Sequence, residues 1–229
     1  MRPRTAPPVL ALLVLTTAAP AAAQVFQEAR PATPEQIAAA KGAGDRMIAK
    51  AKAEGVFAND SRGAVIQLRH IQSGLICQFL TEPANGLAIY PGLARGEDVS
   101  CGVNIGKVSV TLYATRYAPP KTVQAVLRES VAAMRSRIAD LAPYVGTTAS
   151  LQSPAKPGHV KPAELTTLRF TGTVNGAPTY TRSSAAACGP WIVAERVSAP
   201  VDGAMAADVA GDLELEAATD SVCNAATPG

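Results

Sequence analysis

The sequence predicts an α+β fold, in which an antiparallel sheet of hairpins packs against helices in two strand-then-helix halves. Apolar and polar residues alternate along 107–117, which is the pattern of a strand whose two faces lie in different environments. Asn175-Gly176 separates two further strand-like runs and is typical of a two-residue hairpin turn. Apolar residues recur at helical spacing over 122–142, after the strands of the first half. We expect the same order, strands and then a helix, in the second half.

The first half begins with an expected helix, which short strands follow. Thr33 is suited to cap this helix, Pro34 to its first position and Gln36 to a capping box, and Gly55 marks its expected end. Alternation and short apolar runs then predict strands at 66–70, 76–80, 87–90 and 99–103.

Each half is expected to end in an amphipathic helix. Thr122 caps the first of them, and Pro143 ends it. Its apolar stripe consists of Val123, Leu127, Val131, Met134, Ile138 and Leu141. Residues 200–203 open the second helix, and its expected apolar stripe consists of Met205, Val209 and Leu213.

A segment rich in proline and small polar residues, 143–163, is the only candidate for an internal boundary. It would separate residues 24–142, an N-terminal helix and the first half, from a second half at 164–229. The two halves share an order of elements but no residue-level repeat. We therefore expect one compact domain over 33–229.

The first 23 residues have the three parts of a secretory signal peptide. Arg2 and Arg4 precede an apolar run at 8–15, and small residues fill 18–23. Cleavage after Ala23 would start the mature chain at the next residue, Gln24. The alternative, a buried helix in this region, is disfavoured by two prolines and by the lack of a polar face. Because a membrane-spanning helix needs about 20 apolar residues, we expect no span after leader removal and a periplasmic or secreted location.

Removal of the leader changes the charge of the chain. The full sequence has 21 Lys+Arg and 18 Asp+Glu. Two arginines leave with the leader, so the mature chain has 19 against 18, a net charge of +1. No basic cluster remains, which argues against a nucleic-acid partner. Aromatic residues make up only 4% of the chain, which also argues against sugar-binding platforms and single-strand grooves.

The four cysteines predict two structural disulfides. Four cysteines allow three pairings. We favour Cys77–Cys101 and Cys188–Cys223, because each closes a loop within one half of the chain. An oxidising compartment would stabilise both bonds. The cysteines lack the close spacing of zinc ligands and of a redox CxxC pair, and we expect no metal and no cofactor.

His70 is the main candidate for chemistry, together with Arg69 beside it and Ser73 three residues later. A serine nucleophile would need this histidine as base, an acid to orient the ring and donors for an oxyanion. The sequence indicates neither the acid nor the donors, and it has no GxSxG motif. A local hydrogen bond at a strand end is the favoured interpretation of His70.

Acidic residues form a column on the last expected helix. Asp208, Asp212 and Glu216 are spaced four residues apart and could attract a divalent cation. Calcium sites are more often loops that surround the ion with oxygens, so we interpret the column as a solvated helix face. Glu97 and Asp98 are interpreted in the same way, as a solvent-facing loop pair.

The sequence supports two hypotheses of function. The leading one is an exported, non-catalytic binding or interaction protein of the bacterial cell envelope. A cleft between sheet and helices would hold a small ligand, or a surface would bind another envelope protein. The alternative is an unfamiliar periplasmic hydrolase that uses His70. No nucleotide-binding, metalloprotease or EF-hand motif is present, which favours the first hypothesis without identifying the ligand or partner.

Overall fold

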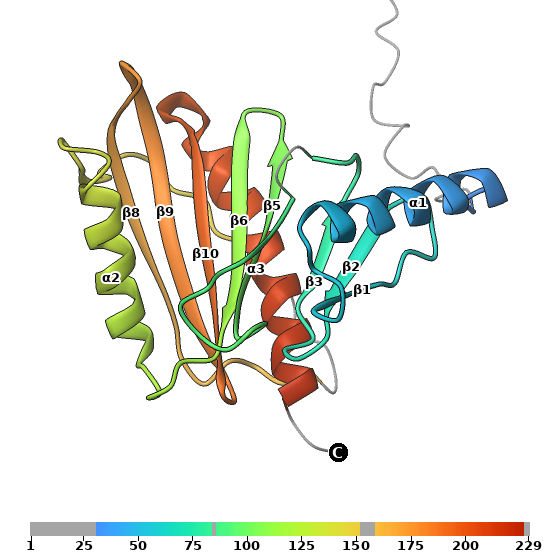
Figure 1. The fold of residues 1–229 in the computed structure, drawn as a ribbon. Helices are drawn as coiled ribbons and strands as arrows, with labels where there is room; N and C mark the ends of the chain where they lie inside the picture. The colour runs from blue at the N-terminus through green and yellow to red at the C-terminus, as the bar shows by residue number, and fades with distance from the viewer. Residues whose placement is uncertain (1–30, 84–85, 152–158, 227–229) are drawn as a thin grey trace, which may run out of the picture. The chain divides into compact units, whose positions relative to one another are not determined.

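A seven-stranded antiparallel sheet, in the order β4-β5-β6-β10-β9-β8-β7, carries most of the fold. The structure is a computed structural model that describes residues 31–83, 86–151 and 159–226, so the expected leader, 1–23, lies outside the described residues. The strands are β4 (Leu87–Ile89), β5 (Asp98–Ile105), β6 (Val108–Thr115), β7 (Ala142–Pro143), β8 (Leu165–Val174), β9 (Ala177–Cys188) and β10 (Trp191–Pro200). The central pair is β6 with β10, so strands from both halves form one sheet (Figure 1).

The predicted hairpin turn is confirmed. Asn175 and Gly176 both have positive φ, 52° and 78°, and Val174 pairs with Ala177 across the turn. Two consecutive left-handed residues match the right-handed twist of the flanking strands, which is why Asn-Gly is favoured there. This turn sets the register of β8 and β9, and with it the face on which each of their side chains lies.

A second, smaller sheet packs beside the first. It has the antiparallel order β1-β2-β3, from β1 (Phe57–Asn59), β2 (Ile66–His70) and β3 (Ile76–Phe79). Helix α1 (Pro34–Lys50) contacts β1 and β2. The predicted capping box at its start is confirmed, because the side chains of Thr33 and Gln36 each accept a hydrogen bond from the other residue's backbone N–H.

The largest part of the core lies between the seven-stranded sheet and helix α3 (Ala204–Ala226), which follows a short 3-10 turn at Val201–Gly203. This helix contacts β6, β9, β10 and also β3 of the small sheet (Figure 1). Buried apolar residues of β6 and β10 face it: Val110, Leu112, Ala114, Val193 and Val197. The alternation predicted for 107–117 is thus confirmed, with the apolar set on the α3 face of the sheet.

The predicted apolar stripe of α3 is wrong. Met205 and Leu213 are 54% and 53% exposed. The residues that pack against the sheet are mostly small: Ala207, Gly211, Leu215, Ala218 and Val222. Small side chains let the helix lie close to the sheet, and they give a weaker periodic signal than the large residues on the outer face.

Helix α2 (Val123–Arg135) covers part of the opposite face of the sheet, over β8 and β9. Its predicted cap is confirmed, since Thr122 accepts from the N–H of Ala125. The helix ends at Arg135 instead of continuing to 142. The chain then turns so that Ala142 pairs with Thr171 in β8, and this strand pairing replaces the last predicted helical turns.

Both expected disulfides are present. Cys77–Cys101 joins β3 of the small sheet to β5 of the large one, and Cys188–Cys223 joins the end of β9 to α3. None of the described helices combines the length and the apolar character needed to cross a membrane. Residues 32–229 form one compact unit, and within it the loop that begins after β7 runs along α3.

Candidate functional site

His70 lies in the core, and one of its two predicted neighbours, Ser73, contacts its ring. Its Nδ1 is 2.7 Å from Oγ of Ser73, and both residues are almost fully buried. The ring packs against Phe57 and Trp191, with ring centroids 5.3 and 5.6 Å away. Burial lowers the pKa of His70 to about 4. An interaction with the Gly96 backbone acts to raise the pKa, but the effect of burial is larger. Among the described residues, Nε2 of His70 has no hydrogen bond of ordinary geometry.

Arg69 does not join His70. Its side chain lies on the opposite face of β2 and binds Asp60, with Nε 2.6 Å from Oδ2. In the described part of the chain, no carboxylate forms a hydrogen bond or an ion pair with the His70 ring, and the ring is shielded from solvent. This geometry is that of a structural His–Ser hydrogen bond that closes the β2–β3 turn.

A buried ionic cluster between the sheet and α3 is the feature that the sequence did not predict. Arg182, in the middle of β9, is fully buried. Its Nε donates to Oε2 of Glu195 at 2.9 Å, and Nη1 donates to Asp212 at 2.8 Å and to the backbone oxygen of Asp208 at 3.0 Å. Nη2 also lies 2.9 Å from Oε2 of Glu195, at an angle too poor for a second hydrogen bond.

The interpretation of the acidic column as a solvated face is therefore wrong. Asp208 is fully buried, and its Oδ1 accepts from Tyr180 Oη at 2.5 Å and from Arg169 Nε at 3.0 Å. Burial alone would raise the pKa of Asp208. Hydrogen bonds from Tyr180, Arg169 and the Ala149 N–H outweigh burial and hold the pKa below its usual range.

The cluster carries more negative than positive charge. Two guanidiniums, those of Arg169 and Arg182, face three carboxylates, those of Glu195, Asp208 and Asp212. Burial raises the pKa of Glu195 to about 7, although Arg182 and the Ser184 hydroxyl oppose the shift. A proton on Glu195 would bring the cluster to neutrality, which is the state that a buried environment favours.

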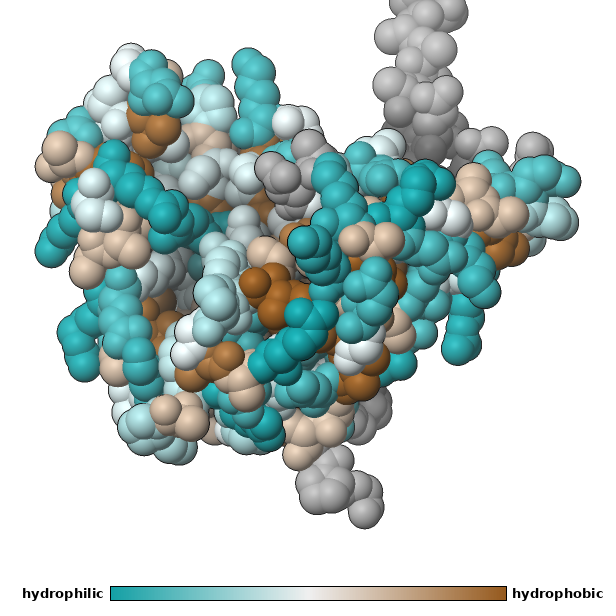
Figure 2. Space-filling model, viewed as in Figure 1, coloured by the Kyte–Doolittle hydropathy of each residue, from teal (hydrophilic) through white to brown (hydrophobic). Residues whose placement is uncertain are grey.

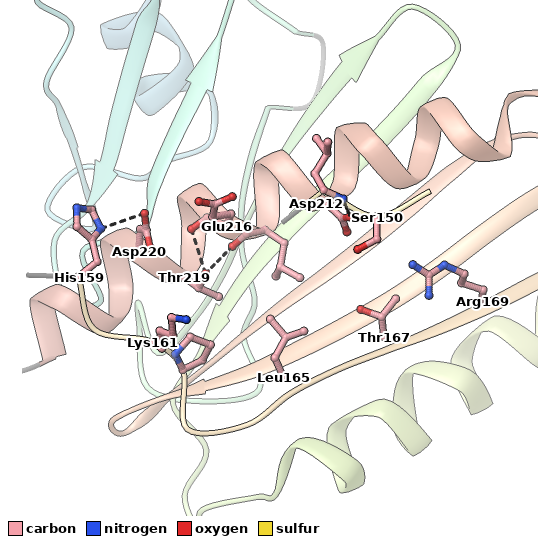
Figure 3. A pocket seen from close by; sticks show the side chains of 13 residues that line it. Ser150, His159, Lys161, Leu165, Thr167, Arg169, Asp212, Glu216, Thr219 and Asp220 are labelled. Atoms are coloured by element: carbon pink, nitrogen blue, oxygen red, sulfur yellow. Dashed lines mark hydrogen bonds and ion pairs between the residues drawn. The ribbon is translucent and has the colours of Figure 1, made fainter. Parts of the chain in front are cut away.

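A cavity of about 470 Å³ lies beside this cluster, between α3 and β8 (Figure 3). Carboxylates of α3 line one side of it, and Leu165, Thr167 and Arg169 of β8 line the other. Most of the charges in its wall already have partners. Asp212 binds Arg182 and the N–H of Leu151, and Asp220 lies 3.1 Å from His159.

Polar side chains along α3 thus bind described parts of the loop that the sequence predicted at 143–163. Successive acceptors on α3 bind successive parts of the loop: Asp208 to Ala149, Asp212 to Leu151, Asp220 to His159 and Asn224 to Val160. The cavity is therefore best explained as the space beneath a loop that is fastened to a helix. Residues 152–158 lie outside the described part of the chain.

A groove of about 390 Å³ lies on the other face of the sheet, beside α2. Helix α2 lies mainly over β8 and β9 and also packs against Ile192 of β10, and the groove lies beside the helix over β5, β6 and β10. Figure 2 shows the surface hollowed beside α2, where hydrophilic and neutral colours predominate. The groove is the cleft between sheet and helix that the binding hypothesis requires.

Three of the chain's five tyrosines line this groove, in a protein with 4% aromatic residues. Tyr113 comes from β6, Tyr90 follows β4, and Tyr117 follows β6. The rings of Tyr90 and Tyr113 are stacked, with centroids 6.2 Å apart and planes 28° apart. All three tyrosines are half-buried, so part of each side chain remains exposed in the groove.

Two arginines line the same groove without an acidic partner. Arg196 stands on β10, the central strand, and Arg137 follows α2. Neither forms an ion pair with a carboxylate of the described residues. Burial raises the pKa of the Tyr113 hydroxyl, as does Tyr90, while the positive charges of Arg196 and Arg137 act in the opposite direction.

The acidic residues of the groove are engaged by neighbours. Asp98 is not the solvent-facing loop residue expected from the sequence, because it begins β5 and accepts from Thr115 Oγ1 at 2.8 Å. Both oxygens of Glu129 lie 2.7 Å from Lys121 Nζ. Glu97, which was expected to face solvent together with Asp98, forms an ion pair with Arg116. The unpaired charge in the groove is therefore positive.

Sequence reasoning missed the buried cluster, and it expected a cleft without identifying the residues of the groove. Ser183 and Arg182 are neighbours in β9, but their side chains lie on opposite faces of the sheet because side chains alternate along a strand. The one usable signal was the alternation in β6, which places Tyr113 on the face opposite the buried apolar residues.

Among the described residues, no group of three or more His, Cys, Asp or Glu side chains is arranged to hold a metal ion. The chain matches no family model and no curated protein.

Proposed function

We propose that this protein is an exported, non-catalytic binding protein of the bacterial cell envelope, and that it holds a small ligand in the groove beside α2. The observation that carries the proposal is the groove itself. It gathers half-buried tyrosines and unpaired arginines in a space of about 390 Å³, within the range of small-molecule sites in proteins. Tyrosine and arginine are also the residues most enriched where proteins bind tightly.

Two further observations support export. The leader-like N-terminus has the composition of a secretory signal peptide. The two disulfides are typical of proteins in oxidising compartments such as the periplasm or the exterior.

The geometry gives the hydrolase alternative no support. The Ser73 hydroxyl is buried with its histidine and also accepts from the N–H of Leu75 at 3.1 Å. A substrate carbonyl could reach it only if the core opened.

Native mass spectrometry of protein purified from its own host tests the proposal. We expect wild type to carry an added small-molecule mass, and Tyr113→Ala to lose it because half of the stacked pair is gone. Leu165→Ala is the matched control: it removes an exposed side chain from the other cavity and should leave the added mass in place. A mass retained by Tyr113→Ala, or no mass in any form, would contradict the proposal.

A further inference from the structure

The positions of the two groove arginines define what the groove recognises. Arg196 pairs with Thr111 of β6 and with Ser183 of β9, so its side chain rises from the middle of the sheet. Arg137 follows the end of α2. The positive charges of both guanidiniums act to lower the pKa of the Tyr113 hydroxyl. An arginine at the centre of a sheet is normally paired with a carboxylate, as Arg182 is on the opposite face. Among the residues that the structure describes, Arg196 has no such partner.

The stacked tyrosines lie one strand away from Arg196. Tyr113 pairs with Ala194, two residues before Arg196 on the same face of β10. Across β5, the hydroxyl of Tyr90 is 3.1 Å from Oγ of Ser100, so the hydroxyls on this side already form a hydrogen-bonded pair. A flat molecule lying against Tyr113 would therefore have guanidinium donors at one end and hydroxyls at the other.

We propose that the groove binds an anionic small molecule that carries a planar ring, with its carboxylate or phosphate between Arg137 and Arg196 and its ring against Tyr113. This inference rests on the proposed function and adds the chemical class of the ligand. Arginine binds carboxylate and phosphate through two parallel hydrogen bonds. Aromatic faces favour offset or edge-on contact with a second ring.

The other charges of the groove favour an anion over a cation. Lys121 neutralises Glu129 and also lies 4.7 Å from the centroid of the Tyr117 ring. Thr115 occupies one oxygen of Asp98, and burial raises the pKa of that carboxyl. The third acid of the lining, Glu195, binds Arg182 on the opposite face of the sheet. With all three acids engaged, a bound cation would face the two uncompensated guanidiniums at short range.

Ligand-observed NMR titration of the full mature protein tests the inference with four small probes: benzoate, phenyl phosphate, benzyl alcohol and benzylamine. We expect benzoate or phenyl phosphate to bind about tenfold or more tightly than benzyl alcohol, and benzylamine to bind least. The binding of the anion should weaken as salt is added. Benzoate and phenyl phosphate distinguish a carboxylate ligand from a phosphate ligand.

Arg196→Gln and Arg137→Gln should each lower anion affinity about tenfold or more, while Arg135→Gln, an exposed arginine of α2 outside the groove, should not. Because Arg137 is exposed, its variant keeps the test valid if Arg196→Gln fails to fold. Equal affinity for benzoate and benzyl alcohol would overturn the inference and leave the proposed function standing. Failure of all four probes to bind would overturn it too, even if native mass spectrometry shows a ligand that depends on Tyr113.

Discussion

Gly211 shows how closely single residues fit in the interior. A β-carbon at this position would lie 2.7 Å from Cζ of Arg182 and 2.8 Å from Oε1 of Glu195. Neither group can move away easily, because both belong to the buried cluster. The absence of a side chain at 211 is therefore what lets α3 approach the charged strands.

Gly211→Ala is expected to lower the free energy of unfolding by about 1–3 kcal/mol, the usual cost of overpacking. Gly42→Ala on α1 is the control, since its nearest neighbour would be the flexible end of Arg46 at 3.6 Å. That change should raise stability by up to about 1 kcal/mol through helix propensity. Urea denaturation measures both, and equal effects of the two changes would refute the close fit at 211.

Glu195 predicts a pH dependence with a definite sign. Its pKa is about 7 in the folded protein and 4.5 in the absence of structure. A carboxyl whose pKa is raised by folding contributes stability that is fully present below pH 4.5 and is lost as the pH rises through 7. Wild type should therefore lose stability relative to Glu195→Gln between these two pH values.

The comparison uses chemical denaturation of both proteins across pH 4 to 8. The titration of His70, whose pKa lies at about 4, contributes to both proteins and cancels in the difference. Stability curves that run parallel over the whole range would show that folding does not raise the pKa of Glu195.

Local signals made several residues predictable. Thr33 and Thr122 were correctly predicted as helix caps, because a cap depends on three or four neighbouring residues. Asn175 was correctly placed in a hairpin for the same reason. The partner of Arg182 could not be predicted, because Asp208 and Asp212 lie on an element that reaches it only through the packing of α3.

At the scale of elements, α3 contacts three other parts of the chain. Its small residues pack on the sheet, and Asp208 and Asp212 reach the charged residues of β8 and β9. Asp212, Asp220 and Asn224 bind the loop after β7. The acidic spacing was visible in the sequence. Its interpretation failed because helical periodicity shows which residues share a face, but not whether that face is buried.

Asp208→Ala should destabilise the fold by about 3–5 kcal/mol, because it leaves the largely buried guanidinium of Arg169 without its carboxylate and removes one of the acceptors of Arg182. It also removes acceptors for Tyr180 and for the loop N–H of Ala149. Glu54→Ala, an exposed acid elsewhere, should change stability by no more than about 0.5 kcal/mol. Thermal unfolding followed by circular dichroism provides the comparison, and a similar melting point for both variants would contradict the role of Asp208.

Helix α2 shows the limit of pattern reading at an element's end. Ile138 continues the apolar stripe, yet the helix ends at Arg135. A β-carbon on Gly172 of β8 would lie 2.3 Å from Cγ2 of Ile138, so Ile138 packs closely on the strand from outside the helix. Competition between a further helical turn and pairing with β8 is decided by residues 30 or more positions away.

At the scale of the whole described fold, the α+β class followed from periodicity and turn chemistry. The strand order did not, because β6 and β10 are more than 70 residues apart in sequence and pair through the register of the complete sheet. The same pairing forms the groove in which we propose that a ligand binds. It places the tyrosines of the first half beside Arg196 of the second, over the part of the sheet face that lies beside α2.

The most direct test of the groove as the binding site is a two-dimensional amide NMR spectrum of the protein titrated with benzoate. We predict that the largest shifts fall on β6 and β10, at residues 111–115 and 194–196, and that Arg135→Gln gives the same map. Shifts concentrated instead on the loop and strand of the other cavity, at 149–151 and 165–169, would contradict the account.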